Sequence, residues 1–282
     1  MNRVLCVVMV ALPVVTTLKS RAALISYISP GALIAENFDS LPSVNPLEDD
    51  TPWLNDSTIP GWVANRTGSG DTVVASTGST ATGALYSFGS SSDTERALGS
   101  VGSGTAKNFT FGVGIVNQSG RTLQDLAISY VGEQWRNAND STQTMTFEYR
   151  MGAGLTLADI GHASTDADGW TSLSSLDFHS PVVGGKVGLI DGNADSHRTA
   201  LSAVLQTDWL DEEVLLLRWS DPDHVGSDHG LAIDDFNMTA TAVPEPSSIA
   251  VLGFCLASGV LWRHRRRRSI LRVDCGRCSN LL

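Results

Sequence analysis

The chain has 282 residues and a formal net charge of −11, which is distributed unevenly along its length. Residues 23–242 hold 9 Lys/Arg and 28 Asp/Glu, a net charge of −19, which repels nucleic-acid phosphate and argues against a general nucleic-acid-binding role. The same region contains no cysteine, so its stability has to come from burial and hydrogen bonds rather than disulfides.

The first 22 residues have the pattern of a secretory signal peptide. A short positive start at residues 1–3 precedes an apolar run at residues 4–18, and small residues near Ala22 suit a signal peptidase. An uncleaved membrane anchor is the alternative, but the run is shorter than the roughly 20 residues of a typical span. We therefore expect residues 1–22 to be removed and residues 23–242 to fold outside the cytoplasm.

Patterns typical of β-strands dominate residues 23–242. Apolar and polar side chains alternate in residues 109–115, 126–130, 144–151 and 201–205, and a period of two indicates strands with one buried face. Clusters of Gly, Ser, Thr, Asn and Asp between these segments predict turns. The region has neither a long helical stripe nor a repeat of fixed period. The sequence therefore predicts an all-β fold with a single β-sandwich of the jelly-roll type.

Three tryptophans with polar or loop-like neighbours are candidates for sugar binding. Trp53 and Trp62 flank a proline-containing stretch, and Trp135 lies between the charged residues Glu133 and Arg136. Flat indole rings stack on sugar faces, and charged neighbours can bond to sugar hydroxyls. Packing in the core or at a sheet edge is the alternative. We interpret the five residues as a candidate polysaccharide-binding surface.

The densest acidic stretch lies near the end of the same region and includes Asp221, Asp223 and Asp228, followed by Asp234 and Asp235. Apolar residues occupy odd positions before the last two acids and even positions after them, and such a slip of one residue predicts a β-bulge. Hard carboxylate oxygens suit Ca²⁺, and two nearby histidines would admit a transition metal instead. We predict a Ca²⁺ site formed by the five aspartates, with a solvated acidic loop as the alternative.

The sequence has no motif that identifies a catalytic site. It contains neither a Gly-x-Ser-x-Gly elbow nor a His-Glu-x-x-His helix. A glycosidase needs two carboxylates that flank a cleft, and the 28 acids of residues 23–242 do not single out such a pair. We therefore predict no catalytic residue, and an extracellular hydrolase acting on a matrix polymer is the alternative function.

The C-terminal segment combines three elements in a fixed order. Pro244, Glu245 and Pro246 precede an apolar run at residues 249–262, and a basic cluster follows at once: Arg263, Arg265, Arg266, Arg267 and Arg268. The prolines end the last strand, the apolar run has the character of a single membrane helix, and the arginines hold the C-terminus inside the cell. Residues 269–282 follow as a cytoplasmic extension.

This order closely resembles the PEP-CTERM sorting signal of Gram-negative bacteria, over residues 243–268. The family usually ends at the basic cluster, whereas this chain continues for 14 residues. The resemblance implies processing by an exosortase and release of the protein to the cell envelope or an exopolysaccharide matrix. Before processing, the protein would be anchored in the inner membrane.

Residues 33–242 also resemble an extracellular bacterial β-domain that recurs in PEP-CTERM proteins, in the phrases at residues 36–41, 83–89, 132–136 and 228–236. The biochemical function of that domain is unsettled, so the resemblance bears on fold and location. The combined expectation is an exported, non-enzymatic envelope or matrix protein that binds exopolysaccharide and Ca²⁺. A purely structural matrix component is a further alternative.

Overall fold

The computed structural model describes residues 23–43, 51–91, 93–163 and 168–244. The chain separates into two compact units, Met1–Ala242 and Val243–Leu282. Every described strand belongs to the first unit, so residues 23–242 contain both sheets and their core and form a folded segment that can be studied alone. The expected signal peptide, the apolar run and the basic cluster lie outside the described residues. Within the described part, no helix has the length and apolar character needed to cross a membrane.

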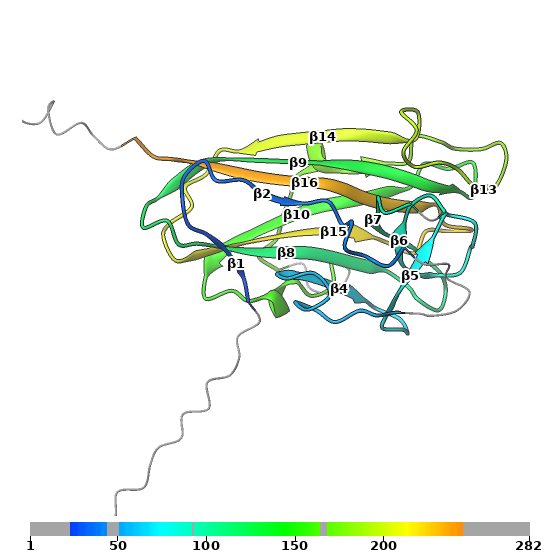
Figure 1. Ribbon diagram of the computed structural model, residues 1–282, viewed down its shortest axis with the longest axis horizontal. Helices are drawn as coiled ribbons and strands as arrows, with labels where there is room; N and C mark the ends of the chain where they lie inside the picture. The colour runs from blue at the N-terminus through cyan, green and yellow to red at the C-terminus, as the bar shows by residue number, and fades with distance from the viewer. Residues whose placement is uncertain (1–22, 44–50, 92, 164–167, 245–282) are drawn as a thin grey trace, which may run out of the picture. The chain divides into compact units, whose positions relative to one another are not determined.

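The described residues form two facing β-sheets, which confirms the predicted all-β sandwich (Figure 1). The first sheet has the order β1-β8-β15-β10-β11, with β4 also paired to β8 and β12 also paired to β10. Its strands are β1 (Ile25–Tyr27), β4 (Trp62–Arg66), β8 (Phe109–Asn117), β10 (Thr144–Ala153), β11 (Thr171–Ser172), β12 (Phe178–His179) and β15 (Glu213–Asp221). Two short 3₁₀ helices, η1 (Leu157–Ile160) and η2 (Ser174–Leu176), lie between β10 and β12 in the sequence.

The second sheet has the order β13-β9-β16-β7-β6-β5-β3, with β14 also paired to β9 and β2 also paired to β16. β2 and β7 pair with different stretches of β16, residues 236–238 and 231–233, so β7, β6, β5 and β3 extend the sheet at one end only. The strands are β2 (Ile34–Glu36), β3 (Thr51–Pro52), β5 (Thr72–Ser76), β6 (Ala84–Phe88), β7 (Ala97–Val101), β9 (Leu123–Asn137), β13 (Gly188–Leu189), β14 (Arg198–Leu205) and β16 (Gly230–Ala242).

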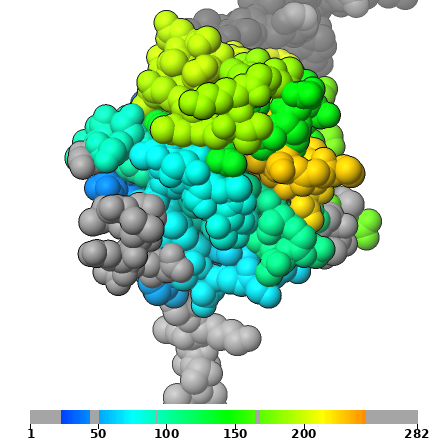
Figure 2. Space-filling view, turned by 90° about the vertical axis from the view of Figure 1, so that its right-hand side faces the viewer, coloured from blue at the N-terminus to red at the C-terminus, as the bar shows by residue number. Residues whose placement is uncertain are grey.

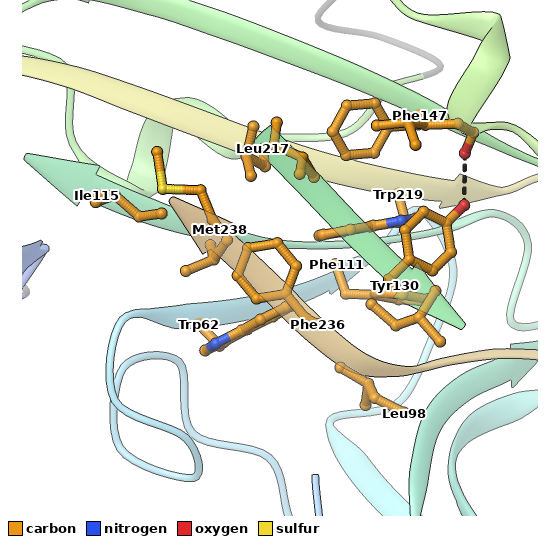
Figure 3. Close-up of a cluster of buried hydrophobic side chains, with 14 of the residues drawn as sticks. Trp62, Leu98, Phe111, Ile115, Tyr130, Phe147, Leu217, Trp219, Phe236 and Met238 are labelled. Carbon is orange, nitrogen blue, oxygen red and sulfur yellow. Dashed lines mark hydrogen bonds between the residues drawn. The ribbon is translucent and has the colours of Figure 1, made fainter. Parts of the chain in front are cut away.

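The main core lies between the sheets and is built around Trp219 of β15 (Figure 3). Its indole stacks on Trp62 with ring centroids 5.7 Å apart and meets Phe147 and Phe236 edge-on at 5.1 and 5.8 Å. The Tyr130 ring also meets Trp219 edge-on, and its hydroxyl donates to the backbone carbonyl of Leu176, the dashed line in Figure 3. Aromatic pairs in such geometries stabilise a core beyond the area that they bury.

Both faces of β15 are buried, as is typical of a strand whose sequence contains a continuous apolar run, here residues 214–217. Leu217 and Trp219 face the main core, while Leu216 packs into a smaller cluster with Leu157 of η1 on the opposite face. Arg218 interrupts the run on that second face, where its guanidinium lies 2.8 Å from Glu148 Oε2 and 3.8 Å above the Trp170 ring. The charged residue that interrupts the apolar run is therefore paired rather than left alone in an apolar layer.

A second apolar cluster covers the outer face of the nine-stranded sheet. It comprises Ala84, Tyr86, Phe88, Ala97, Val101, Trp135 and Ala232. Phe88 and Trp135 stack with centroids 6.2 Å apart and ring planes within 3° of parallel. The connection between β13 and β14 also packs on Trp135, because a Cβ on Gly192 would lie only 2.3 Å from the indole. This cluster therefore covers part of the outer face of the nine-stranded sheet, and the candidate sites lie next to it.

Candidate functional site

A groove of about 810 Å³ opens at the end of the sandwich that carries β5 and β6. Figure 2 looks onto this end, where the cyan residues that include β5 and β6 lie beside the lime residues around β13. The lining residues come from the segment before β3, the end of β4, the β4–β5 turn, β5, the β5–β6 connection, β6, the stretch before β7, and β13. They are Ser43, Arg66, Ser69, Gly70, Thr72, Val74, Ala75, Ser76, Thr77, Ser79, Thr80, Thr82, Gly83, Ala84, Tyr86, Gly89, Ser90, Ser91, Arg96 and Leu189.

The β5–β6 connection, which forms one wall of the groove, is held in place by β9. Arg136 donates from Nη1 to the backbone carbonyls of Gly78 and Ser79, at 3.2 and 3.3 Å. Gly78 has a φ of +85° and approaches the carbonyl of Trp135 so closely that a Cβ would lie 1.9 Å from that oxygen. Only glycine fits this position, so β9 and the connection form one rigid wall.

The groove combines hydroxyl groups with a small apolar floor. Ser69, Ser79, Thr82 and Ser91 are exposed, and further Ser and Thr residues of the lining are partly exposed. Val74, Ala84 and Tyr86 lie beneath them in the outer apolar cluster, and Leu189 of β13, 55% exposed, lies in the same lining. Sugars present hydroxyls and apolar C–H faces together, and this lining offers partners to both.

Arg66 and Arg96 are the charged residues among the described lining, and both guanidinium groups already bond within the protein. Arg66 donates to the Thr72 carbonyl at 2.8 Å and lies over the Phe109 ring. Arg96 is 2% exposed and donates from Nε to Ser87 Oγ at 2.9 Å. Burial lowers the pKa of both guanidinium groups. No carboxylate belongs to the described lining, so the described residues of the groove do not supply the acid pair of a glycosidase.

The predicted sugar-binding surface of Trp53, Trp62, Glu133, Trp135 and Arg136 is wrong. The three indoles are 7%, 1% and 1% exposed, so none can stack on a sugar in this structure. Trp62 belongs to the main core and Trp135 to the outer cluster, while Trp53 donates to Asn55 Oδ1 at 2.6 Å. Glu133 is fully buried and Arg136 nearly so. Polar neighbours in the sequence misled the prediction, because Glu133 and Trp135 share the outer face of β9 but lie beneath the β13–β14 connection.

The five aspartates of the predicted Ca²⁺ site do not gather at one point, because among the described residues no three of them offer carboxylate oxygens within 4.8 Å of one another. Asp221 is buried and accepts a hydrogen bond from Ser100 Oγ at 2.6 Å. Asp228 accepts from the backbone N–H of His224 at 3.0 Å and lies 3.5 Å from its Nδ1. Protein donors therefore occupy carboxylates that were expected to face an ion.

The predicted bulge at Asp234 and Asp235 is confirmed, although it aims its carboxylates elsewhere. β16 advances by three residues from Asp234 to Asn237 while β9 advances by two, from Val131 to Ser129. Asp235 has a φ of +49° and is exposed, whereas Asp234 is 6% exposed. Asp234 does not join the Asp221 loop but meets Glu95 and Glu133 on the outer face of the nine-stranded sheet.

The two histidines beside the acidic loop are held by backbone groups. His229 Nδ1 accepts from the N–H of Ala138 at 2.9 Å, and its Nε2 lies 3.1 Å from the carbonyl of Ser141, so the ring is neutral with both nitrogens used. Burial lowers the pKa of His229 accordingly. His224 Nε2 accepts from the N–H of Thr144 at 3.4 Å. Neither ring faces a serine or threonine as a base would face its nucleophile.

The end of the chain matches a protein-family model described as the PEP-CTERM protein-sorting motif, over residues 242–267. The chain carries a PEP-CTERM sorting motif. The match spans Pro244, Glu245, Pro246 and the basic cluster as far as Arg267, and Arg268 follows directly. A PEP-CTERM motif marks an exported protein that is anchored at its C-terminus before exosortase processing. No curated protein matches the chain.

Several solved β-structures share the sandwich architecture at low similarity. The CBM22-1 xylan-binding domain of Paenibacillus barcinonensis Xyn10C aligns with a TM-score of 0.35 at 10% identity, covering 77% of this chain and 99% of that domain. The xylan-binding module CBM15 gives 0.34 at 11%, covering 76% and 99%. The enzymatically active domain of tailspike protein 4 of bacteriophage CBA120 gives 0.33 at 11%, covering 71% and 22%. At such scores these neighbours say nothing of what the chain with the PEP-CTERM motif binds.

Proposed function

We propose that the β-sandwich is a non-catalytic module that binds a neutral polysaccharide of the cell envelope or extracellular matrix. The C-terminal motif directs the module there, and an exosortase processes the tail. The observation that supports this function best is the groove at β5 and β6, which joins exposed hydroxyls to an apolar floor and contains no carboxylate among its described residues. Polymer and groove would meet through hydroxyl hydrogen bonds and apolar contact.

The charge distribution supports a neutral rather than an anionic polymer. Residues 23–242 carry a net charge of −19, which repels uronate-rich or sulfated chains at a distance. Inside the groove, the guanidinium groups of Arg66 and Arg96 already bond to the protein backbone or Ser87. No cation in the described lining is left to offset that repulsion by pairing with a polymer anion.

Filling the groove with an indole should abolish binding. Thr82 is exposed in the groove wall, and Thr82→Trp is expected to weaken binding of a neutral polysaccharide roughly tenfold or more, about 1.4 kcal/mol per factor of ten. Affinity electrophoresis of residues 23–242 through gels with soluble neutral and acidic polysaccharides, and with the host's own exopolymer, measures the effect. The matched control is Thr199→Trp on the exposed edge strand β14, which should bind like the original protein.

Two results of the same experiment would contradict the proposal. If no polymer retards the original protein, the groove is not a polysaccharide site and a purely structural role is favoured. If reducing ends accumulate when the protein is incubated with a polymer, the module is a hydrolase, and its two carboxylates lie outside the groove.

Removal of the sorting motif should change where the protein is found. Without residues 244–282, the protein is expected to leave the membrane fraction for the periplasm or the culture medium, because the apolar run and the basic cluster that hold the chain are gone. Cell fractionation followed by immunoblotting measures this shift. Deletion of residues 269–282 alone leaves the matched motif whole and should preserve the original distribution. An unchanged distribution after the long deletion would show that the motif does not direct sorting.

A further inference from the structure

Three carboxylates from distant parts of the sequence meet on the outer face of the nine-stranded sheet. Glu133 belongs to β9, Asp234 to β16 at the bulge, and Glu95 to the segment just before β7. Each offers an oxygen that lies within 4.8 Å of the oxygens of the other two. Glu133 is fully buried, Asp234 is 6% exposed, and Glu95 is partly exposed. A single small ion could therefore touch all three at once.

Each of these residues also has an oxygen with no hydrogen-bond partner. Glu133 Oε1, Asp234 Oδ1 and Glu95 Oε1 are buried and unpaired, while the other oxygens of the two glutamates are used. The indole N–H of Trp135 donates to Glu133 Oε2 at 2.9 Å, and the Asn193 amide donates to Glu95 Oε2. Buried polar atoms are almost always paired, so three unpaired oxygens at one point indicate a missing positive partner.

Arg198, opposite Glu133 in the pairing of β14 with β9, is the cationic side chain whose charge reaches this cluster in the described protein. None of the described ion pairs includes any of the three residues. Arg198 lies near enough to Glu133 to act at a distance, but its guanidinium forms an ion pair with Asp195 at 3.5 Å. Three carboxylates this close repel one another unless a cation lies between them.

The connection between β13 and β14 covers the cluster. Ile190 donates its N–H to the Trp135 carbonyl at 3.1 Å, and Gln134 donates its N–H to the His197 carbonyl at 2.9 Å, so both ends of the connection are tied to β9. Between these ties, Gly192 lies on the Trp135 ring and Asn193 reaches Glu95. The carboxylates thus lie in a walled position rather than on an open acidic surface.

We propose that Glu95, Glu133 and Asp234 bind one Ca²⁺ ion beneath the β13–β14 connection. The oxygen-only donor set selects a hard cation over a transition metal, and three carboxylates leave room for water among the six to eight ligands that Ca²⁺ takes. The ion ties the bulge of β16 to β9 and to the segment before β7. This site is separate from the polysaccharide groove, and either one can exist without the other.

Thermal unfolding of residues 23–242 tests the proposal. With Ca²⁺ at about a hundredfold excess over its Kd, the melting temperature is expected to lie about 5–10 °C above the value in EGTA at equal ionic strength. Tb³⁺ is the second probe, because it occupies Ca²⁺ sites and Trp135 lies beside the carboxylates. Excitation of tryptophan should produce Tb³⁺ luminescence that added Ca²⁺ displaces.

Both signals should disappear in Glu133→Gln, whose amide oxygen can still accept the hydrogen bond from Trp135. They should also disappear in Glu95→Gln, which changes a less buried position and keeps the test valid if the first variant folds poorly. The matched control is Asp235→Asn, a neighbour of Asp234 that is exposed and lies outside the cluster. It should retain both signals.

A melting temperature and luminescence indifferent to Ca²⁺ in the original protein would overturn the proposal and leave protons as the neutralising charges. Signals that persist in both Gln variants would overturn it too, because the ion would be bound elsewhere.

Discussion

Replacement of Trp219 with alanine is expected to lower the free energy of unfolding of residues 23–242 by about 3–5 kcal/mol. The side chain is fully buried, and four aromatic rings surround it: Trp62, Tyr130, Phe147 and Phe236. Its removal opens a cavity that the rigid sheets on both sides cannot fill by relaxing. Because a typical domain is stable by only 5–15 kcal/mol, the variant should melt well below the original protein.

Equilibrium unfolding in urea, followed by far-UV circular dichroism, measures this loss. Trp219→Phe is the graded control, since it keeps a ring in contact with its neighbours and should cost markedly less. Leu210→Ala removes a side chain that is 54% exposed and should leave the midpoint within about 0.5 kcal/mol of the original. A Trp219→Ala variant as stable as Leu210→Ala would mean that this aromatic cluster is not the centre of the core.

The second large effect concerns the buried carboxyl of Asp221. This group makes the folding stability fall as the pH rises toward 7, and replacing Asp221 with asparagine should remove that fall. Burial raises the pKa of this carboxyl from 3.8 to about 7, against a lowering by the Ser100 hydrogen bond and by His224, while Asp228 and Asp223 raise it further. Between pH 4 and pH 7 the folded state therefore holds a proton that the unfolded state releases. Stability falls as pH rises through this window and is constant with respect to this group above it.

A shift of this size corresponds to a difference on the order of 4 kcal/mol between pH 4 and pH 8. In Asp221→Asn, which keeps an oxygen to accept from Ser100 Oγ, this contribution vanishes, so the variant should gain on the original protein as pH rises. Urea unfolding of both proteins at half-unit steps from pH 4 to pH 8 gives the difference directly. Asp223→Asn, a partly exposed change in the same loop, is the control and should follow the original profile closely. A constant difference between Asp221→Asn and the original across this range would mean that Asp221 is charged in the folded protein at all these pH values.

The fold was predictable because its strands repeat a simple physical pattern. Alternation predicted β8, β9, β10 and β14, and the apolar run at residues 214–217 is typical of a strand buried on both faces, as β15 is. The apolar alternation shifts by one residue at Asp234 and Asp235, and this shift located the bulge. A strand can keep its apolar residues on the buried face after such a shift only if it contains one extra residue. The parallel pairing of β5 and β6 was not predictable. Parallel neighbours are usually joined by a helix, and the short connection between these two strands contains none.

The sites were less predictable, because their residues meet only in three dimensions. Glu133 and Asp234 look like ordinary outward-facing strand residues, and Glu95 lies in a polar stretch with no distinguishing neighbour. The local density of acids pointed instead to Asp221 and Asp228, which serine and histidine groups already satisfy. For Trp135 the prediction of an exposed indole was wrong. Its outward direction on the sheet could be predicted, but the β13–β14 connection that covers it could not.

The position of β16 has a consequence for how the chain is delivered. β16 is the last of the described strands in the sequence, yet it lies inside the nine-stranded sheet, paired with β9 on one side and with β2 and β7 on the other. It also brings Phe236 and Met238 into the main core, and it ends at Ala242, where the sorting motif begins. A chain that crosses a membrane with its N-terminus first cannot close this sheet until its final strand has emerged. The nine-stranded sheet is thus completed by the segment that lies directly before the sorting motif.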